Sequence, residues 1–248
     1  MKTLLATRSK NQNQHIINYF QNTNIKCIDF PLIDIQAAVI GNSQLLLLEN
    51  LNQFKKIIFI SSNAVDHFQK KLLEANISIA NIQSQFFCVG PTTQKEFLNF
   101  FNFQIDMPEN QYDTNGLLNM KALEIIDESE KILIVRGVGG KEILKSKLEE
   151  RGATVSYLEC YKRVLLDIDF NFISKCTKES EKIFMLITSN EIARHFLASI
   201  KNSGQNFKNL SLIANHNEIF KTLKNQYPNV YLIADINPKN IQDVIENN

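Results

Sequence analysis

The sequence has no tryptophan, only eight glycines and five prolines, and no long apolar run. A helix that crosses a membrane needs about 20 consecutive apolar residues, and the leucine-rich stretch at 45–48 stops at Glu49. The apolar residues of the first segment, MKTLLATRSK, are too few for a secretory signal peptide, and Arg8 follows them. We therefore expect a soluble protein of the cytoplasm with no membrane partner.

The sequence also lacks an excess of basic over acidic residues, or of acidic over basic residues. The 248 residues include 27 Lys and Arg against 26 Asp and Glu, so the formal net charge is +1. No basic tract interrupts this balance, and clustered positive charge is what attracts nucleic acids and acidic membranes, so we expect no nucleic-acid partner. Hydrophobic residues make up 44%, which at this length is enough for one large domain or two of ordinary size.

Patterns that bind metals or form disulfides are absent as well. The cysteines and histidines show no CxxC, HxH or HExxH spacing. We therefore expect no metal site and no disulfide framework, and we expect Cys27, Cys88 and Cys160, which lie in strand-like runs, to be reduced and to fill apolar space. The residues concerned are Cys27, Cys88, Cys160 and Cys176, with His15, His67, His195 and His216.

Short apolar runs recur along the chain and alternate with amphipathic stretches. Most of these runs are continuous, which is typical of parallel strands covered on both faces. Helical patterns separate most of them, so the sequence predicts an α/β fold with right-handed crossovers. The predicted strands are 3–7, 25–30, 56–60, 86–89, 103–107, 131–135, 154–164, 183–187, 210–214 and 230–234.

Two strand regions, 25–35 and 154–166, are too long for a single buried strand. Pro31 interrupts the first, and the second becomes charged from Lys162 onward. A strand that leaves its sheet and continues as a ribbon between two domains would have this pattern.

The chain contains an internal repeat. LLATR, which ends at Arg8, resembles ILIVR, which ends at Arg136, 128 positions later. FISSNAV resembles LITSNEI, and CVGPTTQKEF resembles LIANHNEIFKTL. We infer two copies of a unit with about five strands and five helices, each a doubly wound parallel sheet. Polar residues after the strands would line the carboxyl edges of both sheets, and we expect the two edges to face one shared cleft.

The segment KILIVRGVGGKE, residues 131–142, has the strand, glycine turn and helix start of a phosphate-binding loop. Its glycines do not form GxGxxG, and no GK[ST] follows, so nucleotide binding has weak support. The equivalent turn after Arg8 has no glycine at all. We interpret Gly137, Gly139 and Gly140 as residues of a tight strand-to-helix turn, where any bound anion would be a carboxylate.

These blocks, in this order, resemble the uroporphyrinogen-III synthase family over nearly the whole chain. The matching blocks are LATRS, FPLIDI, FISSNAVDHF, VGPTTQKEF and the long ILIVRGVGGKEILKSKLEERGATVSYLECYKRV. The resemblance implies two flavodoxin-like α/β domains, one of them discontinuous, joined by a two-stranded antiparallel ribbon. The implied bounds are 1–33 with 167–248 for domain 1, 38–157 for domain 2, and 30–37 with 158–166 for the ribbon.

The resemblance also implies a reaction. The family consists of hydro-lyases that close the linear tetrapyrrole hydroxymethylbilane into uroporphyrinogen III and invert its last ring. Loss of the terminal hydroxyl as water gives an azafulvene, and attack by a pyrrole carbon gives a spiro intermediate that reopens. The resemblance implies no cofactor and no metal, and we expect a monomer. An association with the enzyme of the preceding step is left open.

Tyr161, in CYKR, matches the family tyrosine that is proposed to assist departure of the hydroxyl. A phenol can donate a hydrogen bond to a leaving oxygen without ionising. The alternative is a tyrosine that only packs on a domain. Thr93, in GPTT, matches a cleft threonine of the family, and its alternative role is to cap the next helix.

The remaining candidates follow strands in both copies of the repeat and are interpreted as contacts to substrate carboxylates. For the hydroxyl and amide residues the alternative is helix capping, and for the arginines it is a structural salt bridge. Asn217 stands where the family has a threonine, so contact there is in doubt, although Asn can also cap a helix. The candidates are Arg8, Ser61, Ser62, Asn63, Arg136, Thr188, Ser189, Asn190 and Asn217.

Two other functions are compatible with the same pattern. A non-catalytic, two-lobed binding protein for a small polyanion would also have a cleft lined with helix N-termini. A nucleotide-dependent α/β enzyme is the weaker alternative, because the glycine motifs are incomplete.

Overall fold

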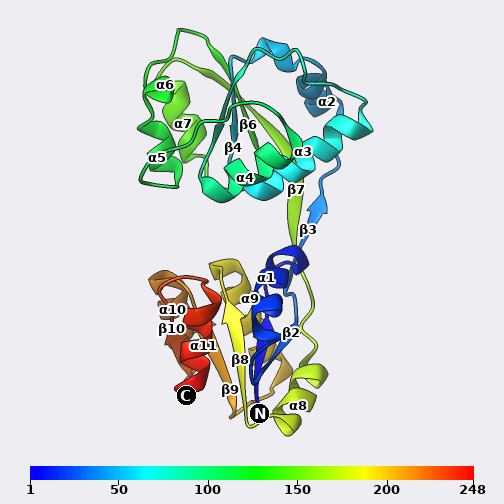
Figure 1. Ribbon diagram of the computed structural model, residues 1–248, viewed down its shortest axis with the longest axis vertical. Helices are drawn as coiled ribbons and strands as arrows, with labels where there is room; N and C mark the ends of the chain where they lie inside the picture. The colour runs from blue at the N-terminus through cyan, green and yellow to red at the C-terminus, as the bar shows by residue number, and fades with distance from the viewer. The chain divides into compact units, whose positions relative to one another are not determined.

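The computed structural model describes residues 1–248 and divides into two compact units (Figure 1). Unit 1 consists of Met1–Asp34 and Val164–Asn248, and unit 2 is Ile35–Arg163. Each unit is built on one five-stranded sheet with helices on both faces. The predicted α/β fold class is therefore confirmed.

The sheet of unit 1 has the order β10-β9-β8-β1-β2, and all its pairs are parallel. Central strands are buried along nearly their whole length, as continuous apolar runs predict for parallel sheets. The strands are β1 (Lys2–Ala6), β2 (Ile25–Asp29), β8 (Lys182–Ile187), β9 (Leu210–Ala214) and β10 (Val230–Leu232).

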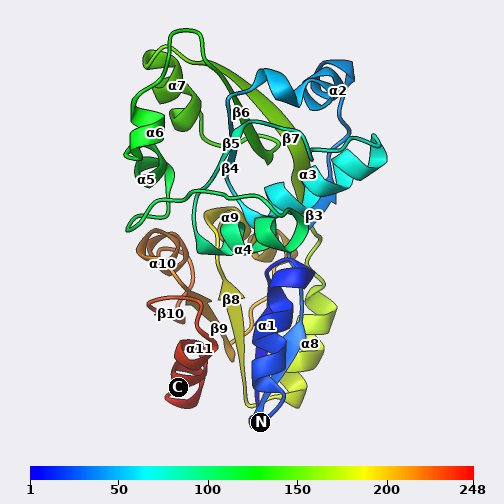
Figure 2. The same cartoon turned by 45° about the horizontal axis from the view of Figure 1, so that its top comes forward.

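Helices cover both faces of this sheet (Figures 1 and 2). One face is packed by α1 (Lys10–Phe20) and α11 (Pro238–Glu246), which bury Ile16 and Ile241. The other face is packed by α8 (Phe170–Glu179), α9 (Asn190–Ser203) and α10 (Asn217–Lys224). Both chain termini lie in this unit.

The sheet of unit 2 has the order β3-β7-β6-β4-β5. Its strands are β3 (Ile33–Ala37), β4 (Lys56–Phe59), β5 (Gln85–Cys88), β6 (Lys131–Gly137) and β7 (Thr154–Leu165). The predicted strand at 103–107 is wrong in extent, because only Asp106 pairs, in an isolated parallel bridge to Phe87. Pro108 follows within two residues and has no N–H to continue the ladder, which fits this early end.

The helices of unit 2 separate cleanly onto the two faces of the sheet (Figure 2). One face carries α2 (Asn42–Glu49), the short 3₁₀ turn Leu51–Gln53, α3 (Ser62–Glu74) and α4 (Pro91–Phe100). The opposite face carries α5 (Thr114–Leu118), α6 (Lys121–Glu124) and α7 (Ile143–Glu150).

The predicted repeat corresponds to the order of the strands. In unit 1 the order is β2-β1-β8-β9-β10, and in unit 2 it is β7-β6-β4-β5 followed by the bridge at Asp106. The two orders match strand for strand, although β1 and β2 open the chain in unit 1 whereas β6 and β7 close it in unit 2. One unit is therefore a circular permutation of the other.

The two long regions differ in structure. Region 25–35 contains two strands, β2 and β3, with a break that includes Pro31, whereas β7 runs unbroken over 12 residues. The amide of Ala38 donates to the carbonyl of Cys160 at 2.9 Å, and the amide of Leu166 donates to that of Leu32 at 3.0 Å. Residue numbers rise along one strand as they fall along the other, so β3 and β7 are antiparallel.

Gly116, in α5, has no space for a side chain. A Cβ atom there would lie 1.7 Å from the carbonyl oxygen of Gln111, whereas one at Gly41 would meet nothing within 4 Å. We expect Gly116→Ala to lower the free energy of unfolding by about 1–3 kcal/mol, as overpacking does. Gly41→Ala, the matched control at the N-cap of α2, should cost less than about 1 kcal/mol. Urea unfolding of both variants measures this, and equal losses would contradict it.

Candidate functional site

A pocket of about 490 Å³ lies at the carboxyl edge of the sheet of unit 2. Both aromatic and basic side chains line it, together with the glycine turn that follows β6. Its lining includes Tyr112, Arg136, Lys141, Tyr157, Tyr161 and Arg163. Of these six, only Arg136 and Tyr161 are among the candidates predicted from the sequence.

The ring of Tyr161 packs against two other groups. It stacks on His67, with ring centroids 5.6 Å apart and an interplanar angle of 28°. It also lies so close to Gly137 that a Cβ added there would come within 2.7 Å of the ring carbons Cε2 and Cζ. A side chain at position 137 would therefore collide with the Tyr161 ring. Gly139 and Gly140, by contrast, have positive φ and form the predicted tight turn.

A bulge in β7 directs Tyr161 to this position. Arg136 is paired with Glu159, but the next residue, Gly137, is paired with Tyr161, so β7 contains one extra residue, Cys160. Side chains alternate between the faces of a strand, and an extra residue changes which face the following side chains occupy. Tyr161 accordingly joins Cys160 in the cluster packed beneath α3 and α4.

The Tyr161 hydroxyl contacts Ser61. The two oxygens are 3.1 Å apart, and either can be the donor. Ser61 also caps α3, because its Oγ accepts a hydrogen bond from the amide of Ala64 at 3.1 Å. Tyr161 is only 1% exposed, whereas Ser61 is partly exposed.

Arg136 is buried and has several partners at the sheet edge. Its guanidinium donates to the carbonyl oxygens of Gly137 and Gly139 and to the Glu142 carboxylate. It also lies 3.6 Å from the Glu159 carboxylate and 4.2 Å from the centroid of the Tyr157 ring. This geometry fits the salt-bridge alternative, and a contact from Arg136 to a ligand stays a prediction.

Glu142 connects Arg136 to Tyr157. Its second carboxylate oxygen accepts a hydrogen bond from the Tyr157 hydroxyl at 2.8 Å. That bond is the main cause of a lowered pKa for the Glu142 carboxyl. Burial, followed by the same bond, raises the pKa of Tyr157 to about 12, so its hydroxyl is a protonated donor at neutral pH.

At the carboxyl edge of unit 1, Arg8 follows β1 and has no acceptor for its guanidinium in the structure. The turn that presents it is fixed by buried Asn13, whose side chain donates to the carbonyls of Ala6 and Arg8 and to the Asp29 carboxylate. Burial lowers the pKa of Arg8 from its ordinary value. A half-buried cation without a partner is suited to binding an anion.

The two equivalent serines cap equivalent helices, as the capping interpretation predicts. Ser189 Oγ accepts from the amide of Ile192 at 3.1 Å, as Ser61 Oγ does from Ala64. Thr188 precedes this cap, while Ser62, Asn63 and Asn190 lie in the first turns of α3 and α9 and are half-buried. Asn190 also accepts from the Thr222 hydroxyl at 3.3 Å. Their contacts to a substrate stay predictions.

Two capping predictions are wrong. Thr93 lies inside α4 and is 4% exposed, because α4 begins at Pro91 and its N-cap is Gly90. Asn217 is the first residue of α10, and the cap is His216, whose Nδ1 accepts from the amide of Glu218 at 3.4 Å. Both helices therefore begin earlier than a cap at the predicted residue would require, and at α4 proline fits the first helical position.

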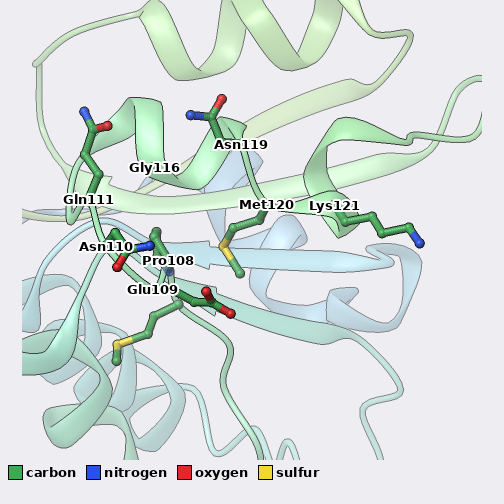
Figure 3. Close-up of a pocket in the computed structure, with 9 residues that line it drawn as sticks. Pro108, Glu109, Asn110, Gln111, Gly116, Asn119, Met120 and Lys121 are labelled. Carbon is green, nitrogen blue, oxygen red and sulfur yellow. The ribbon is translucent and has the colours of Figure 1, made fainter.

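A second pocket in unit 2, of about 500 Å³, lies between the segment 107–111 and the helices α5 and α6 (Figure 3). None of its residues was predicted to be functional. Figure 3 shows Lys121 extending away from the other labelled side chains. The pocket combines the thioethers of Met107 and Met120 with exposed amides, and it brings no group of catalytic residues together.

Neither a metal centre nor a membrane-spanning helix is found. No three His, Cys, Asp or Glu side chains are grouped so that they could hold a metal ion. No helix combines the length and the apolar character that crossing a bilayer requires.

Sequence reasoning missed His67, Tyr157 and Glu142. His67 lies on the buried face of α3, where the helical periodicity of the sequence predicts a core position. Burial lowers the pKa of its imidazole. Tyr157 precedes Tyr161 by four residues, which in a regular strand puts both side chains on one face but about 13 Å apart, too far to predict a shared pocket. The bulge at Cys160 was the missing information.

Comparisons with known proteins agree with one another. A family model described as "Uroporphyrinogen-III synthase HemD" matches residues 14–237. The uroporphyrinogen-III synthase of Proteus mirabilis is 29% identical over 66% of this chain and 82% of its own length. That of Escherichia coli K12 is 24% identical over 80% of each chain.

Solved structures show the same fold. A mutant uroporphyrinogen III synthase from the extremely thermophilic bacterium Thermus thermophilus has a TM-score of 0.62 and 9% identity, covering 98% of this chain and 97% of its own. A uroporphyrinogen-III synthetase from Helicobacter pylori 26695 has a TM-score of 0.61 and 14% identity, covering 100% and 99%. At these identities the structural likeness supports the fold alone.

The four thiols should react slowly in the folded protein. Burial raises the pKa of Cys27 and Cys160 to about 12, that of Cys88 to about 11, and that of Cys176 above its ordinary value. Because the thiolate is the nucleophile, we expect Cys88 to react roughly 100-fold more slowly than free cysteine at pH 8. An aromatic disulfide reagent followed by absorbance measures this, with guanidinium-unfolded protein as the control. A native thiol as fast as free cysteine would contradict it.

Proposed function

The chain belongs to the uroporphyrinogen-III synthase family, and on that premise we propose that it converts hydroxymethylbilane into uroporphyrinogen III. The observation that carries the proposal is the family match over residues 14–237, which spans both units. The family consists of enzymes, so the alternative of a non-catalytic binding protein is not favoured.

The proposed chemistry needs positioning more than reactive groups. Loss of the terminal hydroxyl leaves an azafulvene, and closure through a spiro intermediate inverts the last ring. Holding the reacting carbons in one geometry can account for much of such a rate enhancement. A hydrogen-bond donor near the departing hydroxyl assists the first step. Tyr161, which lines the unit 2 pocket, and the Ser61 hydroxyl beside it would supply such donors.

The eight carboxylates of hydroxymethylbilane require anion-binding groups. We propose that Arg8 in unit 1 and the helix starts capped by Ser61 and Ser189 bind some of them. Lys141 and Arg163 at the unit 2 pocket add positive charge that the sequence analysis did not assign. A net charge of +1 is compatible with this, because backbone N–H groups carry part of the interaction.

Three finer parts of the proposal rest on the family alone. We propose that the protein acts in the cytoplasm, as a monomer, and that it receives its substrate from the enzyme that makes hydroxymethylbilane. That the two sheet edges share one substrate site also stays a prediction. Sedimentation of the purified chain, alone and with the preceding enzyme, would test the oligomeric state and the association.

The product of freshly made hydroxymethylbilane tests the function. We expect the purified protein to give the type III isomer, because the bound chain is held so that the last ring inverts before closure. The isomers are separated by chromatography after oxidation to porphyrins. A no-enzyme control gives the type I isomer, and the same product with the protein present would contradict the proposal.

Arg8 should contribute to substrate binding. We expect Arg8→Met to raise KM roughly 10-fold or more with little change in kcat, since a charge-assisted hydrogen bond to a carboxylate would be lost. Arg8→Lys should retain part of the affinity. Lys10→Met removes the same charge from an exposed position two residues away and should leave KM unchanged. Equal effects of Arg8→Met and Lys10→Met would show that only general charge matters.

A further inference from the structure

The hydroxyls of Tyr161 and Ser61 lie together, but the two residues differ in exposure. Tyr161 is 1% exposed, so almost none of its surface can meet a ligand, although its ring borders the pocket. Ser61 is partly exposed and lies 3.1 Å from the Tyr161 oxygen. Ser61 is not among the residues that line the pocket, but its partial exposure makes it more accessible to a group from solvent than the nearly buried Tyr161.

Tyr161 has little freedom to turn outward. The ring stacks on His67, and Gly137 lies so close to it that an added Cβ would come within 2.7 Å of the ring carbons. The bulge at Cys160 fixes the direction of the side chain, and the backbone oxygen of Tyr161 accepts from the amide of Val138 at 2.7 Å. These contacts hold the Tyr161 hydroxyl against Ser61.

The hydrogen bonds of Ser61 define the direction of its proton. A hydroxyl has one proton to donate and two lone pairs to accept with. Ser61 Oγ accepts from the amide of Ala64, and it can accept a second bond from the Tyr161 hydroxyl. The Tyr161 proton has no other acceptor in the structure, so this arrangement satisfies it and leaves the Ser61 proton free to be donated to a ligand.

We propose that Ser61, not Tyr161, donates the hydrogen bond to the departing hydroxyl of the substrate, and that Tyr161 is a positioning residue that acts through Ser61. This rests on the proposed function and changes the role first predicted for both residues. Two donors into one oxygen polarise it, so the Ser61 O–H becomes a stronger donor than an isolated serine.

The step balances without any further reactant. The bond between the terminal methylene carbon and its oxygen breaks, and the oxygen leaves with the electron pair. The lone pair of the pyrrole nitrogen forms the azafulvene, and the proton lost from that nitrogen completes the water. Ser61 stabilises the charge that develops on the oxygen and keeps its own proton.

The equivalent serine in unit 1 lacks this arrangement. Ser189 caps α9 with the same geometry, but its Oγ has no hydrogen-bond partner other than the amide of Ile192. In β2, the strand equivalent to β7, no tyrosine occurs, since its sequence is IKCID. Both copies of the repeat thus have the capping serine, but only unit 2 pairs that serine with a tyrosine hydroxyl.

Steady-state kinetics of variants at these two positions tests the proposal. We expect Ser61→Ala to lower kcat roughly 100-fold with little change in KM, and Ser61→Thr, which keeps the hydroxyl, to restore it to within about 5-fold of wild type. Tyr161→Phe should lower kcat only about 5- to 10-fold, and Ser61→Ala/Tyr161→Phe should be no slower than Ser61→Ala.

Loss of the cap must be separated from loss of the donor. Ser61→Gly removes the hydroxyl but costs only a few tenths of a kcal/mol as an N-cap, so it should be as slow as Ser61→Ala while unfolding close to the wild-type temperature. Asp169→Ala removes the cap of α8, a residue assigned no role in the candidate site, and should lower stability without lowering kcat.

The relative kcat values of Tyr161→Phe and Ser61→Ala decide the outcome. If Tyr161→Phe is as slow as Ser61→Ala, or slower, Tyr161 acts directly and the proposal is wrong. If Ser61→Gly and Ser61→Ala keep kcat within about 3-fold of wild type, no serine donor exists, which also overturns it. A wild-type protein that gives no type III isomer would instead reject the proposed function itself.

Discussion

The antiparallel contact between β3 and β7 is the constraint on which the rest of the structure depends. The chain leaves unit 1 near Asp34 and re-enters it near Val164, and the hydrogen bond from Leu166 to Leu32 brings these two points together. Without it, the pairing of β1 with β8 would close a loop of some 180 residues, which costs entropy. With unit 2 folded between paired strands, the effective loop is short. A discontinuous sheet can then form as one cooperative unit.

The permutation preserves the edge at which polar residues gather. Since β1 matches β6 and β8 matches β4, the strand ends of both units present the same residue types at the same side of their sheets. The copies have nevertheless diverged in electrostatics. Arg136 is buried with Glu142 and Glu159, whereas Arg8 has no acidic partner. Of these two equivalent arginines, Arg136 therefore stabilises the sheet edge of unit 2, whereas Arg8 in unit 1 is available for a ligand.

Much of the fold was predictable because burial on both faces leaves a continuous apolar signal, and nine of the ten predicted strands exist as strands. Helix starts were less predictable, since Thr93 and Asn217 have the right chemistry but lie inside their helices. The contacts of Tyr161 could not be predicted from the sequence. They depend on a one-residue bulge in β7 and on the close approach of its ring to Gly137, which only a residue without a side chain allows. Periodicity describes regular strands, and the candidate site arises where β7 stops being regular.

That irregularity explains how one strand can connect two units and also carry a candidate site. Up to Glu159, β7 keeps a fixed parallel register with β6, the shifted pair of Gly137 and Tyr161 ends that pairing, and the segment from Cys160 to Leu166 pairs with the β3 segment. The change of register is what turns Tyr161 toward α3, whose N-cap is Ser61. A neutral hydroxyl pair suits a substrate with many carboxylates, since a fixed negative charge there would repel it. The donor also cannot lose its proton near neutral pH, because a serine hydroxyl does not titrate in that range.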